Sequence, residues 1–230
     1  GCTSTQNIPL FYWHWNKGIF CVEVQPGGLL TFGTRLPGNA VTWLVMDDTY
    51  AFQDSFSVIG YPTDIHDISM RENGNALLIG VDARYIDMSL IVPGGNPNAL
   101  VQGLLVQEQD ENHVPIFQWS SFDHFEITDA AHFVDLTAAV VDYVHCNSIA
   151  EDMDGNILLS CLALGECTKI DQTTGEIIWR FGRLDADSSW FTMIGDPLGG
   201  FSAQHDFNTF EPGLYTVFDN GRFHSPQVSR

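Results

Sequence analysis

Residues 143–182 read YVHCNSIAEDMDGNILLSCLALGECTKIDQTTGEIIWRFG. Short apolar and β-branched runs alternate here with turn signals, Asp-Gly-Asn at 154–156 and Thr-Thr-Gly at 173–175. Asp, Asn and Gly suit tight hairpin turns because they tolerate positive φ. The runs expected to form strands are 144–150, 157–161, 167–170 and 176–181. Four antiparallel strands in about 40 residues match one blade of a β-propeller, so this stretch predicts an all-β fold of four-stranded blades.

The rest of the chain repeats this unit incompletely. Residues 66–125 show a similar pattern with a long insertion at about 84–102, whose core at 93–97 can only be a loop. The first part, ending with 41–46, resembles another blade, and the part from Phe201 gives only two strands. Roughly three and a half to four blades are expected, whereas propellers usually close with about four to eight. We therefore expect residues 1–230 to form a single domain, a truncated propeller with an open sheet edge. A small, irregular closed propeller is the alternative.

Two local features lie beside the best-defined unit. Residues 129–143 alone have the length and composition for a helix, although their Val and Thr content disfavours one. Of the five cysteines, Cys161 and Cys167 flank a hairpin turn at 164–165. They could pair in an oxidising compartment or remain buried free thiols, and the sequence leaves both readings open.

The charge balance restricts the partners of this protein. The chain has 9 basic and 29 acidic residues, a formal net charge of −20. Such a surface repels a phosphate backbone, so nucleic-acid binding is not expected. The longest apolar run, 136–144, is far too short to span a bilayer, and no signal peptide is visible, although the chain begins with Gly1 rather than Met. The sequence leaves the oligomeric state open.

Three histidines recur in a register of tryptophan, histidine and glycine. His66, His145 and His205 precede Gly74, Gly155 and Gly213 by eight, ten and eight residues, and each histidine follows a tryptophan: Trp43, Trp119 and Trp179. The first strand of a propeller blade lines the central channel. The register therefore predicts that the three imidazoles begin inner strands and point into one axial cavity, while the tryptophans pack between blades.

The acidic neighbours of these histidines admit two readings. Asp67 and Asp206 could fix the tautomer of the adjacent imidazole, or they could turn away from it. The histidines themselves could instead form hydrogen bonds between blades and serve only to hold the sheets together. Three histidines in one register favour a functional cluster, because stability alone would accept varied residues.

Seven motifs follow one another along the chain: Asp-Ile-His-Asp-Ile (64–68), Trp-Ser-Ser-Phe-Asp-His-Phe (119–125), His-Cys-Asn-Ser-Ile (145–149), Asp-Gly-Asn-Ile-Leu-Leu-Ser (154–160), the run 170–182, Phe-Ser-Ala-Gln-His-Asp (201–206) and Val-Phe-Asp-Asn-Gly-Arg (217–222). In this order and spacing they resemble the arylsulfotransferase family, the PAPS-independent enzymes built on a six-bladed propeller.

The resemblance implies a catalytic cycle without a cofactor or metal. In the family a histidine attacks the sulfur of an aryl sulfate, and the resulting sulfohistidine passes its sulfuryl group to a phenol. His205 matches this nucleophile, His66 and His145 match residues that bind sulfuryl oxygens and protonate the leaving phenolate, and Asn147 matches an amide that binds a sulfuryl oxygen. The implied partners are a small aryl sulfate and a phenol, and the implied location is extracytoplasmic.

One position departs from the family pattern. Leu162 stands where an arginine that clamps the sulfate is expected, and losing a fixed cation from an anion site should weaken catalysis. Arg84, Arg180 or Arg183 could compensate, although the sequence does not place them in the channel. The alternative is a non-catalytic propeller that binds ligands without turnover. A quinoprotein-like module is a third reading, for which the sequence shows no supporting calcium or disulfide pattern.

Overall fold

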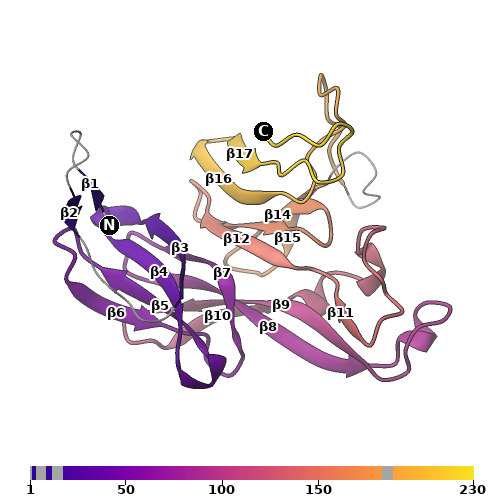
Figure 1. Cartoon of the computed structure of the whole chain (residues 1–230), viewed down its shortest axis with the longest axis horizontal. Helices are drawn as coiled ribbons and strands as arrows, with labels where there is room; N and C mark the ends of the chain where they lie inside the picture. The colour runs from indigo at the N-terminus through magenta and orange to yellow at the C-terminus, as the bar shows by residue number, and fades with distance from the viewer. Residues whose placement is uncertain (1, 4–8, 12–17, 183–188) are drawn as a thin grey trace.

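The computed structural model describes residues 2–3, 9–11, 18–182 and 189–230. These residues form an all-β structure in which successive antiparallel sheets follow the chain, from the indigo N-terminal sheet to the yellow C-terminal strands (Figure 1). The strands are β1 (Cys2–Thr3), β2 (Pro9–Phe11), β3 (Ile19–Val24), β4 (Leu30–Arg35), β5 (Val41–Met46), β6 (Phe52–Phe56), β7 (Thr63–Met70), β8 (Ala76–Ile86), β9 (Ala99–Gln109), β10 (Pro115–Ser120), β11 (Val140–Asp142), β12 (Cys146–Glu151), β13 (Ile157–Cys161), β14 (Glu166–Ile170), β15 (Ile177–Gly182), β16 (His205–Glu211) and β17 (Leu214–Phe218).

The sheets have the topology of propeller blades. β3 to β6, β7 to β10 and β12 to β15 are three meanders in which each strand pairs with the next, and β16 and β17 form a two-stranded unit. We refer to them as the first to fourth sheets. β1 and β2 form a separate short ribbon. The described residues thus form a partial propeller whose sheets do not close into a ring, as the sequence predicts.

Side chains from facing sheets make the core. Alternate residues of one strand point to opposite faces, so β13 contributes to two inter-sheet clusters. Ile157 and Leu159 pack towards the second sheet, and Leu158 packs towards the fourth. Full burial of a side chain such as Leu158 contributes about 1.5–3 kcal/mol. The tryptophans of the register each lie in or against one of these clusters, which confirms their predicted packing role: Trp43, Trp119 and Trp179.

The predicted insertion at 84–102 begins and ends in strand. β8 continues to Ile86 and pairs with β9 from Ala99 onward, so the two strands make one long hairpin. The predicted loop at 93–97 lies at its tip, beside the short 3-10 helix η3 (Met88–Leu90). The side chain of Met88 is fully buried, which anchors the tip of the hairpin to the core between the second and third sheets.

The helix for which residues 129–143 have the length and composition does not form, as their Val and Thr content led us to expect. The segment begins at the 3-10 helix η5 (Ile127–Asp129) and continues as coil to β11, which pairs in parallel with Leu100–Gln102 of β9. The backbone N–H of Ala131 donates to the carbonyl of Ala163 at 2.7 Å. Tertiary hydrogen bonds and β-branched residues therefore outweigh the local helix pattern. Further 3-10 turns are η1 (Pro26–Gly28), η2 (Pro37–Asn39) and η4 (Ser121–Asp123). No helix in the described ranges is long and apolar enough to cross a membrane.

The suggested pairing of Cys161 with Cys167 does not occur. Across β13 and β14, Cys161 pairs with Glu166 and Cys167 pairs with Ser160, so the two thiols lie on opposite faces of the third sheet. Cys161 belongs to the core towards the second sheet and Cys167 to the core towards the fourth. Both are buried free thiols, as the second reading of the sequence holds.

Candidate functional site

The first strand of each sheet is irregular near the histidines. Pairing slips between Thr63 and Ile68 in β7, between Cys146 and Ser148 in β12, and between His205 and Asn208 in β16. Such bulges bend a strand and redirect its side chains. His145 itself has φ of 46°, a conformation that is uncommon outside glycine. These local distortions turn side chains away from the regular alternation of the strand.

The three predicted histidines converge. The ring centroids of His66 and His145 are 5.1 Å apart, and those of His66 and His205 are 6.5 Å apart. Each ring is half-buried, and the three come from different sheets. Residues far apart in the sequence therefore form one imidazole cluster of His66, His145 and His205.

Two of the imidazoles are held by carboxylates. Nδ1 of His66 lies 2.6 Å from Asp64 Oδ1, and Nδ1 of His145 lies 2.6 Å from Asp142 Oδ2. The same carboxylates accept the backbone N–H groups of His66 and His145. A hydrogen bond from Nδ1–H orients each ring and leaves its Nε2 for other partners. The hydrogen bond to Asp142, followed by the charges of Asp142 and Asp64, raises the pKa of His145 despite its partial burial.

His205 has no carboxylate partner among the described residues. Its Nδ1 lies 3.1 Å from the carbonyl of Ala203 and 3.0 Å from Nδ2 of Asn220, which also donates to that carbonyl at 2.7 Å. Burial lowers the pKa of His205, the Ala203 carbonyl raises it, and the neighbouring His66 and His145 lower it further, so that the net direction is downward. Asn220 is a site residue that the histidine register did not reveal.

The residues that follow the histidines do not orient them. Both oxygens of Asp67 accept backbone N–H groups, from Ile68 and from Ile149 of the next sheet, each at 2.8 Å. Asp206 accepts from Asn208 Nδ2 at 2.6 Å. Asp67 and Asp206 therefore turn away from the imidazoles, and Asp64 and Asp142 take the orienting position. Asp two or three residues before His, bonded to its backbone N–H, is a turn pattern readable in sequence.

The register of the histidines is not uniform. The Asp67 carboxylate accepts the N–H of Ile149, and the Ser148 hydroxyl accepts the N–H of Phe207 at 2.9 Å, so Asp67 and Ser148 are equivalent between sheets. His66 precedes Asp67 directly, but Asn147 precedes Ser148. Asn147 therefore occupies the position of a histidine in the third sheet, and His145 reaches the cluster from two residues earlier.

The predicted ligand Asn147 is almost fully buried. Its Nδ2 donates to the carbonyl of Gln204 at 2.8 Å, which ties the third sheet to the segment before His205. Its Oδ1 is buried and has no hydrogen-bond partner within the described part of the chain. One amide hydrogen of Asn147 is thus committed to holding the His205 segment in place.

A cavity of about 280 Å³ adjoins the cluster. Its described lining combines the imidazoles of His66 and His145 and their carboxylates with residues of the second sheet: Ile79, Gly80, Val81, Gln102, Gly103 and Leu104. Neither Arg84 nor Arg180 lines it. Arg84 is bound by Asp82 at 2.7 Å, and Arg180 is bound by Glu166 and Asp129, each at 2.8 Å. Arg183, the third candidate cation, lies outside the described residues.

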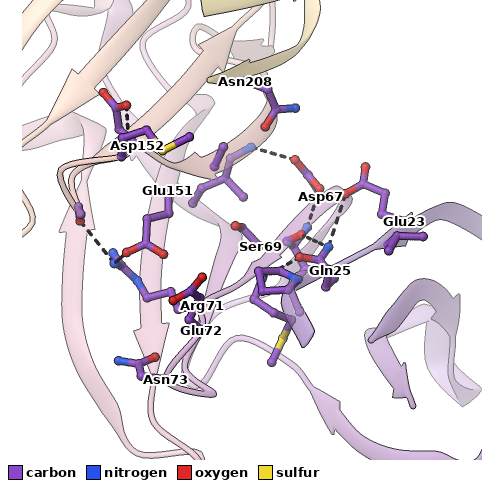
Figure 2. A pocket seen from close by; sticks show the side chains of 18 of the residues that line it. Glu23, Gln25, Asp67, Ser69, Arg71, Glu72, Asn73, Glu151, Asp152 and Asn208 are labelled. Carbon is purple, nitrogen blue, oxygen red and sulfur yellow. Dashed lines mark hydrogen bonds and ion pairs between the residues drawn. The ribbon is translucent and has the colours of Figure 1, made fainter. Parts of the chain in front are cut away.

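The other ends of the inner strands enclose a larger and acidic cavity of about 840 Å³. Figure 2 shows the carboxylates of Glu23, Asp67, Glu72 and Glu151 around it, with the guanidinium of Arg71 next to Glu151. Arg71 also contacts Glu108 at 3.3 Å and Gln172 at 2.6 Å. An aryl sulfate anion would be repelled from this end, whereas imidazole N–H groups at the histidine end can donate hydrogen bonds to an anion.

No group of three or more His, Cys, Asp or Glu side chains in the described ranges is arranged to hold a metal ion. The His66, His145 and His205 rings instead lie close together, with Asp64 and Asp142 bound behind two of them, and His66 and His145 line the cavity of about 280 Å³. Such an arrangement provides a nucleophile, a proton donor and hydrogen-bond donors for an anionic group.

Solved structures that are similar to this chain share only part of its length and little of its sequence. A streptogramin B lyase structure is 10% identical with a TM-score of 0.42, covering 74% of this chain and 42% of that chain. A protein of unknown function from Bacteroides caccae is 12% identical with a TM-score of 0.32, covering 75% of this chain and 63% of that chain. This chain therefore spans less than two thirds of either structure.

Sequence comparisons are decisive for the family. No curated protein sequence matches this chain. A family model described as arylsulfotransferase (ASST) matches residues 39–229, which is most of the chain and includes all three histidines of the imidazole cluster. The chain belongs to the arylsulfotransferase family.

Proposed function

We propose that this protein transfers a sulfuryl group from an aryl sulfate to a phenol through a sulfohistidine at His205. The observation that carries the proposal is the contrast within the imidazole cluster. The surroundings of His205 lower its pKa, and those of His145 raise its pKa. At a pH between the two pKa values, His205 is mostly neutral and His145 is mostly protonated, the pair that nucleophilic and acid catalysis require.

The chemistry follows from the hydrogen bonds at Nδ1. With Nδ1–H of His205 donating to the Ala203 carbonyl, the lone pair of Nε2 attacks the sulfur and forms an N–S bond. The S–O bond to the aryl group breaks, its electron pair stays on the phenolic oxygen, and Nε2–H of His145 supplies the proton. An acceptor phenol then gives its proton to His145 and attacks the sulfur. The N–S bond breaks, and its electron pair returns to Nε2 of His205.

Charge on the sulfuryl oxygens requires donors in place before the reaction. Nε2–H of His145 is committed to the phenolic oxygen because its Nδ1–H is bonded to Asp142, so His66, bonded to Asp64 through Nδ1, supplies a donor when its Nε2 carries a proton. Asn147 can add only the amide hydrogen that is not bonded to Gln204. Neither Arg84 nor Arg180 reaches the cluster. The weak complement of cations also favours a second candidate, a propeller that binds aryl compounds without turnover.

An assay of transfer separates the two candidates. The protein is incubated with p-nitrophenyl sulfate and a phenol acceptor, and both p-nitrophenol and the new aryl sulfate are measured. The proposal expects acceptor-dependent release that disappears in His205→Asn. It expects normal release in the control His113→Asn, since His113 is bound to Asp54 outside the cluster. Binding of p-nitrophenyl sulfate with no release in the wild type would instead support the non-catalytic candidate.

A further inference from the structure

Leu162 lies directly beside the imidazole cluster. Its backbone N–H donates to the carbonyl of His145 at 2.9 Å, and the next N–H, of Ala163, donates to the carbonyl of Val144 at 3.0 Å. These bonds continue the pairing of β12 with β13 past the end of the strand. The half-buried Leu162 side chain is therefore fixed next to the residue that carries the His145 ring.

An apolar cleft of about 270 Å³ opens at this position. Phe133, Val134, Val140 and Leu162 contribute to its walls. A dry apolar cavity of about 150 Å³ is enough to bind benzene, so the cleft has room for one aromatic ring or two fused rings. Val140 is 55% exposed, which leaves apolar surface in the cleft for a ligand to cover. We call this space the Leu162 cleft.

Hydrogen bonds, strand pairing and ring stacking hold the wall opposite Leu162 in place. Ala131 is bonded to Ala163, β11 pairs with β9, and the ring of Phe133 stacks on Phe223 with centroids 4.6 Å apart. The segment for which the sequence pattern suggests a helix therefore holds Phe133 and Val140 across from Leu162. A preformed apolar space of this kind binds a rigid ring at little conformational cost.

The Leu162 cleft and the cavity beside the imidazoles share two residues. Asp142 and His145 line both spaces, so the His145 ring stands at their boundary. The ionisable residues in the described lining of the cleft are Asp135, Asp142 and His145. Two carboxylates and no lysine or arginine in that lining make the cleft unfavourable for a sulfate group, whereas its walls suit an uncharged ring.

We propose that the Leu162 cleft is the binding site for the aromatic ring of the substrate, with the phenolic oxygen at His145 and the sulfuryl group towards His66 and His205. The substrate class rests on the proposed function. Leu162 then has a positive role: the residue that removes a cation from the site supplies an apolar wall for the ring. An arginine at this position would introduce a charge beside that wall.

The test measures direct binding of 2-naphthol, which is uncharged at neutral pH, by calorimetry or by the fluorescence of the probe. We expect Leu162→Arg and Val140→Asp to weaken binding by roughly 10-fold or more, because each places a charge against the ring. Leu162→Ala should weaken it by a smaller factor. The control Leu29→Ala, which trims a half-buried leucine just before β4, should bind as the wild type does.

Equal affinity of the wild type, Leu162→Arg and Val140→Asp for 2-naphthol would overturn the proposal, and so would failure of the wild type to bind. Circular dichroism checks each variant, and Val140→Asp at an exposed position decides the question if Leu162→Arg does not fold. Binding needs no turnover, so Leu162-dependent binding without sulfuryl transfer would defeat the proposed function alone. Transfer with a KM unchanged in the Leu162 variants would defeat the cleft alone.

Discussion

The start of β12 and the start of β16 each bring one histidine to the same cluster but surround its ring differently. His145 is bonded to the Asp142 carboxylate, which raises its pKa. His205 is bonded to a backbone carbonyl beside Asn220, and partial burial lowers its pKa. Identical side chains thus acquire different protonation at one pH. In the proposed mechanism, the carboxylate behind Nδ1 of His145 and the burial of His205, more than the histidines themselves, set which ring serves as acid and which as nucleophile.

The largest expected effect comes from removing the lone pair of His205. His205→Asn should reduce transfer from every aryl sulfate, with good and poor leaving groups alike, on the order of 10⁴-fold or more. The reason is that the surroundings of His205 lower its pKa and so favour the neutral imidazole that the proposed attack needs. The measurement is the initial rate with p-nitrophenyl sulfate and with phenyl sulfate. If His205→Asn retained transfer from either donor, His205 would not be the nucleophile, the role that distinguishes it from His145.

The next effect should depend on the leaving group. His145→Gln removes the proton donor, so transfer from phenyl sulfate should fall by roughly 10²–10⁴-fold. Transfer from p-nitrophenyl sulfate should fall much less, because p-nitrophenolate leaves without a proton. The measurement is the ratio of the rates with phenyl sulfate and p-nitrophenyl sulfate, compared between the wild type and His145→Gln. Equal losses with both donors would assign His145 to oxygen binding and not to proton transfer.

Asp142→Asn sharpens the comparison through its pH dependence. An ordinary histidine titrates at about pH 6.5, and the proposed mechanism needs His145 protonated and His205 neutral. The raised pKa of His145 places the alkaline limb above that value, and the lowered pKa of His205 places the acid limb below it. Replacing Asp142 should move the alkaline limb to lower pH and reduce kcat/KM by roughly 10-fold at neutral pH. An unmoved alkaline limb would show that the carboxylate does not control His145.

The smallest effect on transfer is expected from changing Asn220, which contacts Nδ1 of His205. Asn220→Ala removes an amide that contacts Nδ1 and supports the Ala203 carbonyl, so transfer should fall only a few-fold, as for loss of one neutral hydrogen bond. The matched control is Asp206→Asn. Asp206 is next to His205 in sequence, but its carboxylate is bonded to Asn208. We expect rates within about two-fold of wild type in that control, since it leaves the bonds at Nδ1 in place. A larger loss in Asp206→Asn than in Asn220→Ala would reverse this assignment.

Local turn chemistry made the third sheet predictable. Asp-Gly-Asn at 154–156 places a tight turn before a run of apolar residues, and β13 spans the predicted 157–161. Turn residues in the sequence likewise predict the pair of strands β16 and β17. The structure of 129–143 could not be predicted from its own residues, because it depends on a hydrogen bond to Ala163 and on pairing with β9, which lie elsewhere in the chain. Propensity within the segment holds no information about them.

The imidazole cluster was predictable as a set of residues but not in its details. The repeat identified His66, His145 and His205, yet irregular pairing in each inner strand shifts His145 relative to the other two. A one-residue irregularity changes which side chain faces the axis, and sequence spacing does not report it. The orienting carboxylates Asp64 and Asp142 belong to turns that precede the histidines, whereas adjacency in sequence left open whether Asp67 and Asp206 orient the rings or turn away.

The Leu162 cleft was not predictable from any one part of the sequence. Leu162 follows β13, Phe133 lies in the coil after η5, and Val140 begins β11. These residues meet because Ala131 is bonded to Ala163 and because β11 pairs with β9. In the sequence Leu162 marks only a missing cation, because its apolar neighbours come together only when the three segments fold.

Detection of the covalent intermediate tests the central claim most directly. The protein is mixed with an aryl sulfate in the absence of acceptor, quenched in alkali to preserve an N–S bond, digested and analysed by mass spectrometry. The account predicts one added SO₃ on the peptide that contains His205, its disappearance on adding a phenol, and its absence in His205→Asn. An SO₃ adduct on His66 or His145, or transfer between phenols with no adduct at any stage, would contradict it.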